Sequence, residues 1–216
     1  MRQIIALIKK DLILEWRQRY AINGILLHAV SSTFVVYLSV KMLNAASWNA
    51  VYWLVLLFAS VSAVGKSFIA ESSGRQLYYY TIVDAKSIII SKLIYNAWLT
   101  ALISLLCLLT YSVFLGFPVQ HIGIYMLIVA LGAIGFSSTF TLLAAIAGKS
   151  ANGGLLMPVL SFPIIIPLLL VAIKASKKAV DGIDVSLIAK DLLVLGALNI
   201  LIVVMAYVLF PFLWKD

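Results

Sequence analysis

The hydrophobic residues of this chain lie in long runs that contain no charged residue. Such runs occupy residues 20–40, 42–65, 93–148, 150–173 and 192–214. A helix that crosses about 30 Å of hydrocarbon needs about 20 apolar residues, because it rises about 1.5 Å per residue. Four runs therefore predict one membrane-spanning helix each, and the long run 93–148 predicts two.

The longest run is predicted to turn at Gly116-Phe117-Pro118, which polar Gln120 and His121 follow. The apolar runs lack the alternation of apolar and polar residues that the strands of a membrane barrel show. We therefore predict an all-α integral membrane protein with a single transmembrane domain over residues 1–216. Its six spans are expected at about 22–43, 48–65, 93–115, 122–147, 152–173 and 192–213.

Residues 1–19 predict a helix on the membrane surface rather than a further span. Ile5, Ile8, Leu12 and Trp16 recur at steps of three and four, which places them on one helical face. Lys10 and Arg17 lie on the other side, as in amphipathic helices that lie in the membrane interface. The alternative is that these residues form only a positively charged anchor.

The composition agrees with a membrane protein, because 64% of the 216 residues are hydrophobic and only 11% are charged. This excludes a disordered chain, a nucleic-acid-binding domain and a disulfide-stapled secreted domain. With both termini in the cytoplasm, inside segments hold 11 lysines and arginines and outside segments hold five. The predicted outer loop 174–191 is the exception, since it carries four lysines. The net charge of +8 then mostly faces anionic lipid.

The predicted cytoplasmic loop 66–92 is far longer than a passive connection needs to be. Phe68 and Ile69 are expected at the membrane surface, while Glu71 and Arg75 face water. The loop either docks a partner protein or is a connector that lies on the membrane.

The fourth and fifth predicted spans carry residues that shape helix packing. In the fourth, Gly135 and Thr139 are spaced by four, which lets helices approach closely within the bundle or between two copies. In the fifth, Pro158, Pro163 and Pro167 are expected to interrupt the helix. Such a helix either moves or lines a pore, or has a static kink.

The chain carries no recognisable energy source, catalytic group or metal site. Gly148-Lys149-Ser150 ends like a phosphate-binding loop, but that loop needs a glycine at 143, where Leu143 stands. No acid lies inside a predicted span except Asp191 at an edge, and Cys107 is the only cysteine. Of the two histidines, His121 is the better placed to contact an incoming ligand. We therefore expect no enzyme, and an ATPase on a separate chain.

Two segments resemble motifs of ABC-2 type exporter permeases, and more closely of the CcmB family. Gly153-Gly154-Leu-Leu with Pro163-Ile-Ile-Ile-Pro167-Leu-Leu is similar to the paired glycines and prolines of that family's fifth span. Glu71-Ser-Ser-Gly74-Arg75-Gln76-Leu, with Lys92 before the third span, resembles the segment that couples permeases to their ATPase. It departs from the pattern in being less acidic and in ending on Tyr78-Tyr79-Tyr80.

The resemblance covers nearly the whole chain and implies a function. Members of this family are permease subunits, in the bacterial inner membrane, of the ABC complex that supports haem delivery to the periplasmic haem chaperone during c-type cytochrome maturation. It implies a pair of ATP-binding CcmA subunits, paired permease subunits, and association with CcmC, CcmD and the chaperone CcmE. ATP would bind to the partner, and haem would be a transported or handled ligand rather than a firmly bound cofactor.

The resemblance also assigns roles to residues. ATPase coupling would belong to Glu71, Gly74, Arg75, Gln76 and Lys92, and the break in span five to Gly153, Gly154, Pro163 and Pro167. Because the spans lack a histidine pair, we expect this subunit mainly to transmit ATPase motion. The alternatives are an ABC-2 permease that exports a lipid, glycan or drug, and a membrane scaffold that transports nothing.

Overall fold

The computed structural model describes residues 2–17, 19–40, 43–65, 68, 83–148 and 153–215. These residues form seven α-helices and no strand: α1 (Arg2–Arg17), α2 (Arg19–Ser39), α3 (Ala45–Val64), α5 (Ala85–Leu115), α6 (Ile122–Ala147), α7 (Gly153–Val180) and α8 (Val185–Lys215). Five of them, α3, α5, α6, α7 and α8, contain segments long and apolar enough to cross a membrane. The predictions of an all-α fold and of multiple membrane-spanning helices are confirmed.

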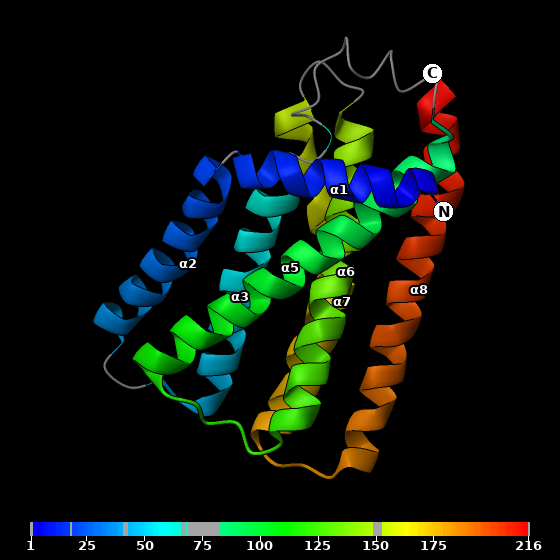
Figure 1. Ribbon diagram of the computed structural model, residues 1–216. Helices are drawn as coiled ribbons and strands as arrows, with labels where there is room; N and C mark the ends of the chain where they lie inside the picture. Colours follow the sequence, from blue (N-terminus) through cyan, green and yellow to red (C-terminus); the bar gives the residue numbers. More distant parts are fainter. Residues whose placement is uncertain are drawn as a thin grey trace.

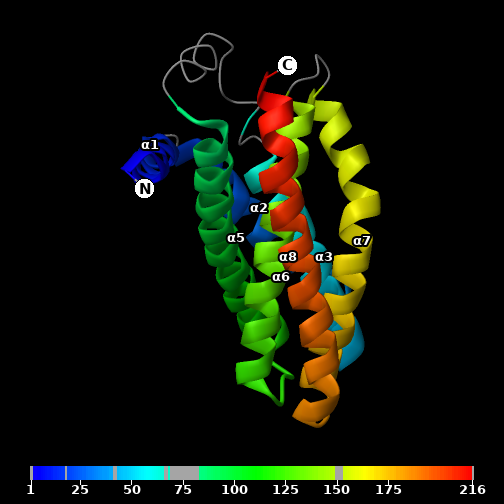
Figure 2. The same ribbon diagram turned by 90° about the vertical axis from the view of Figure 1, so that its right-hand side faces the viewer.

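The helices from α2 to α8 run along one bundle and alternate in direction, and α1 lies across one end of it (Figure 1). The start of α5 and the carboxyl end of α8 lie at this same end, which we call the α1 end (Figures 1 and 2). The connections 116–121 and 181–184 lie at the opposite end. Helix α6 is central and packs against α3, α5, α7 and α8.

The first two helices, α1 and α2, occupy the region where a surface helix and the first span were predicted. Helix α2 covers most of the predicted span 22–43, and Leu27–Ser39 is the apolar segment that lies wholly within its described residues. A sixth span therefore stays a prediction. Helix α1 forms where a surface helix was predicted, with Leu7 buried while Ile5 and Leu12 are exposed. Its position in a membrane interface also stays a prediction.

Three helices extend beyond the predicted span ends. Helix α5 begins at Ala85 instead of 93, so the connection predicted at 66–92 ends earlier. Helices α7 and α8 leave only residues 181–184 between them, where a loop over 174–191 was predicted. The prediction began span three after Lys92, ended span five before Lys174 and began span six after Asp191. Lys92 pairs with Asp11, and Asp191 pairs with Lys174 and Lys178, so these charges are accommodated inside helices.

Helix ends follow local chemistry. The Asn44 side chain accepts a 2.7 Å hydrogen bond from the Ser47 backbone N–H and so caps the start of α3. Helix α5 stops at Gly116, and the α7–α8 turn contains Gly182; both have positive φ, at 76° and 72°. Glycine adopts this conformation without the steric cost that a side chain adds.

The core near the opposite end is an aromatic cluster centred on α3. Trp48 stacks with Tyr52 and meets the edge of Tyr111 from α5. The Tyr52 hydroxyl donates to the Ser104 carbonyl at 3.2 Å, and the Trp53 Nε1 donates to Ser176 Oγ at 2.7 Å. These bonds join α3 to α5 and α7. They satisfy polar atoms that would be costly to leave unpaired in hydrocarbon.

The small residues of α6 allow close contact inside the bundle. A Cβ atom added at Gly135 would lie 2.3 Å from Leu168 Cδ1 of α7 and 2.9 Å from Asn199 Oδ1 of α8. One added at Gly132 would lie 2.4 Å from the Trp53 ring of α3. Three neighbouring helices therefore approach α6 more closely than any larger residue would permit.

Candidate coupling site

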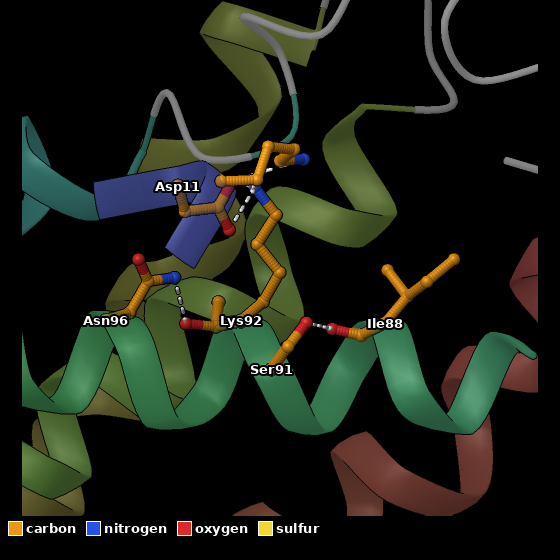
Figure 3. A network of polar contacts seen from close by, with 7 residues as sticks. Asp11, Ile88, Ser91, Lys92 and Asn96 are labelled. Atoms are coloured by element: carbon orange, nitrogen blue, oxygen red, sulfur yellow. Dashed lines mark hydrogen bonds and ion pairs between the residues drawn. The ribbon is translucent and has the colours of Figure 1, made fainter. Parts of the chain in front are cut away.

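A buried ion pair joins α1 to α5 at the α1 end. Lys92 Nζ lies 3.2 Å from Asp11 Oδ2 and donates a 3.3 Å hydrogen bond to Asp11 Oδ1. Only 7% and 6% of the two side chains are exposed. Figure 3 shows Lys92 extending from α5 toward Asp11 on α1. Because an unpaired buried charge is costly, the pair specifies where α1 rests on α5.

The sequence of α1 places Asp11 toward α5. Asp11 follows Leu7 by four residues, so both lie on one helical face, and both are buried. Lys10 Nζ lies 3.2 Å from Asp11 Oδ1 and remains partly exposed. One turn further along each helix, Tyr95 of α5 forms a side-chain hydrogen bond with Glu15 of α1. Two polar links in register therefore hold the two helices together.

The same stretch of α5 is also fastened to α6. Asn96, one turn after Lys92, donates a 2.8 Å hydrogen bond from Nδ2 to Thr141 Oγ1 of α6. Ser91 bonds within α5, from Oγ to the Ile88 carbonyl at 2.7 Å (Figure 3). The first turns of α5 therefore contact α1 on one side and the centre of the bundle on another.

Phe68 is the described residue between α3 and α5 that reaches this site. Its side chain is 4% exposed, and its ring centroid lies 5.6 Å from that of Phe210 on α8. Lys92 Nζ lies 5.6 Å from the centre of the Phe68 ring, within the range of a cation–π interaction. The surface position predicted for Phe68 is wrong, because the ring fills space between α5 and α8.

The sequence-predicted coupling residues fall into two groups. Glu71, Gly74, Arg75 and Gln76 lie outside the described residues. Lys92 lies within α5 and is buried against Asp11. Sequence reasoning missed Asp11 as its partner. A weak signal existed, because Asp11 shares the helical face of Leu7 instead of the basic face of the segment.

A second charged cluster lies at the opposite end of the bundle. Asp191 of α8 lies 2.7 Å from Lys178 Nζ and 3.3 Å from Lys174 Nζ, both on α7. Lys178 Nζ also donates to the Leu187 carbonyl at 2.9 Å. The cluster fastens the start of α8 to the end of α7. Two paired helices therefore occupy most of the range 174–191, where a loop was predicted.

His121 directly precedes α6 at the same end. Its backbone N–H donates to the Ala179 carbonyl of α7 at 3.0 Å, and its carbonyl accepts from the Tyr125 N–H at 3.0 Å. The side chain is half-buried. The backbone of His121 thus connects α6 with α7. A contact between its side chain and a ligand stays a prediction.

The predicted break in span five lies within α7. Gly153 and Gly154 begin the helix, which continues through Pro163 and Pro167 to Val180. The helix is bowed rather than divided (Figure 2). A proline removes one backbone donor, and the remaining hydrogen bonds carry the helix past it. Both prolines are exposed, while Ile165 and Leu168 between and beside them face the core.

Comparison with known proteins identifies one family. The sequence model of that family, described as CcmB protein, matches residues 2–213. No curated protein and no solved structure matches the chain. The family match extends over all seven described helices, including both partners of the buried ion pair. The chain therefore belongs to the CcmB family, which implies an inner-membrane permease of an ABC transporter in haem export and cytochrome c biogenesis.

Proposed function

We propose that this chain is the permease subunit of an ABC complex that supports haem delivery to the periplasmic haem chaperone during c-type cytochrome maturation. The observation that carries the proposal is the family match over residues 2–213. A bundle of long apolar helices is the architecture that a permease requires. In this proposal the chain forms one permease domain and does not itself hydrolyse ATP.

The role of the subunit would be to transmit motion from a partner ATPase. The α1 end would face the cytoplasm, and Glu71, Gly74, Arg75 and Gln76 would contact the ATPase. The segment that holds these residues leads directly into α5, whose second turn is paired with α1 through Lys92 and Asp11. A displacement of that segment would therefore act on two helices together.

The proposal includes partners and ligands. A pair of CcmA subunits would bind ATP beneath a pair of permease subunits, and CcmC, CcmD and CcmE would handle haem beside them. Haem would be handled transiently rather than held as a resident cofactor. Gly153, Gly154, Pro163 and Pro167 would let α7 flex during this cycle, and His121 would meet ligand at the periplasmic end.

Deletion of the gene is expected to abolish covalent haem in c-type cytochromes. The physical reason is that thioether attachment needs haem delivered outside the membrane, and the complex would lack its membrane subunit. Covalent haem is measured by peroxidase staining of denaturing gels. Re-expression of this chain should restore the stain and recover an ATP-binding subunit on purification.

Haem synthesis provides the control for that experiment. Non-covalent b-type cytochromes should keep their absorbance in the deletion strain, which separates a delivery defect from a shortage of haem. Unchanged staining of c-type cytochromes in the deletion strain would contradict the proposed function.

Cysteine labelling tests the orientation. A cysteine at Asp184 should react with a membrane-impermeant maleimide in intact cells, whereas a cysteine at Asp84 should react only after the membrane is opened. Both side chains are exposed and lie at opposite ends of the bundle. The natural Cys107 is 1% exposed and should add little background. Labelling in the reverse pattern would refute cytoplasmic termini.

A further inference from the structure

We propose that Phe68, Lys92 and Asp11 form a relay that carries displacement of the chain between α3 and α5 to helices α5 and α1. The relay rests on the proposed function, since it names the positioning residues through which ATPase motion would act. It requires that Phe68 be held tightly, that Lys92 respond to Phe68, and that Asp11 follow Lys92.

Phe68 is held on several sides although it lies outside the helices. It packs on Phe210 of α8, and its Cβ lies 3.4 Å from the position that a Cβ on Gly148, at the end of α6, would occupy. It is also within the buried core that includes Val64 and Ile89. Closely packed interiors transmit displacement because they have little free volume. The ring cannot shift without moving its neighbours.

Lys92 joins two interactions of different geometry. Its ammonium lies over the Phe68 ring at 5.6 Å and beside the Asp11 carboxylate at 3.2 Å. A cation–π interaction is strongest where the cation is shielded from water, and Lys92 is buried. If the ring moves, the ammonium loses its contact with the Phe68 ring while Asp11 stays beside it. It then depends more strongly on Asp11, so α1 has to stay with α5.

A second contact extends the connection to α8. Lys86, in the first turn of α5, lies with Nζ 5.3 Å from the ring centre of Tyr207 on α8. Phe68 reaches α8 through Phe210, three residues further on. The start of α5 is therefore coupled to α8 as well as to α1. A local push at this end would reorient these helices as a group instead of bending one of them.

The relay is tested by the ratio of cytochrome c maturation to ATP hydrolysis. Both are measured in membranes of the deletion strain that carry the complex with each variant chain, and both are divided by the amount of chain present. Phe68→Leu keeps an apolar side chain but removes the ring. The pair Asp11→Leu with Lys92→Met removes the two charges of this buried ion pair together.

Both variants are expected to keep ATP hydrolysis within about twofold of the natural chain and to lower maturation by about fivefold or more. Lys92→Arg keeps a cation beside the Phe68 ring and Asp11, and it should keep the ratio of the natural chain. Phe212→Leu is the matched control, because Phe212 is an exposed phenylalanine of α8 at the same end. It should leave the ratio unchanged.

A natural ratio in both test variants would overturn the relay. So would a parallel loss of maturation and ATP hydrolysis, because it would show a purely structural role. If the paired variant does not reach the membrane, the milder Phe68→Leu decides the question. Failure of the proposed function is distinguishable, since it would appear as intact c-type cytochromes in the deletion strain before any variant is made.

Discussion

Replacing Lys92 with methionine is expected to lower the free energy of unfolding by about 3–5 kcal/mol, because the change leaves the buried Asp11 carboxylate without its buried cation. Methionine fills most of the space of the lysine stem, so lost packing contributes little. Lys10 stays 3.2 Å from the same carboxylate and is partly exposed, which places the loss near the lower end of the range. In thermal unfolding of the purified complex in detergent, the Tm should fall by about 10 °C.

The paired substitution separates an unpaired charge from a loss of packing. Asp11→Leu combined with Lys92→Met should recover most of the lost stability, since a buried ion pair exchanged for apolar residues is often neutral or stabilising. Lys190→Met, on an exposed lysine of α8, should change the Tm by no more than about 2 °C. If the double variant is as unstable as Lys92→Met alone, Asp11 is not the partner that matters.

Helix positions could be predicted because every membrane span needs about 20 apolar residues without charges. Apolar runs bounded by charges located all the long helices, and for α6 the observed bounds, Ile122–Ala147, are those predicted. The rule failed where a charge is neutralised by another helix. Lys92 and Asp191 were taken to end their spans, yet each lies inside a helix and pairs with a residue from elsewhere in the chain. Periodicity within one segment carries no information about such partners.

The candidate site shows the same limit. Lys92 was singled out by its place before the third span, but its burial and its link to α1 arise only when α1 folds across α5. Phe68 looked like a membrane-surface residue, because the hydrophobicity of its segment is the same whether its ring faces lipid or the bundle. The contact with Phe210 decides between these positions, and it joins residues far apart in sequence.

Replacing Gly132 with alanine is expected to lower the free energy of unfolding by about 2–3 kcal/mol through overpacking. The new methyl group would lie 2.4 Å from Cη2 and 2.5 Å from Cζ3 of Trp53, so the ring has to move. Trp53 is fully buried, and its Nε1 is hydrogen-bonded to Ser176 at 2.7 Å. Moving the ring strains that bond between α3 and α7. The cost therefore exceeds the gain of up to about 1 kcal/mol that alanine offers in a helix.

Two companion variants show whether the cost comes from Trp53. Gly196→Ala in α8 is the matched control, because nothing lies within 4 Å of the added Cβ, and it should leave the Tm unchanged or slightly raised. Trp53→Phe removes the part of the ring that meets the new methyl group. In a double-mutant cycle, Gly132→Ala should therefore cost less in the Trp53→Phe background than in the natural chain. Equal costs in both backgrounds would mean that α6 and α3 do not meet at these two residues.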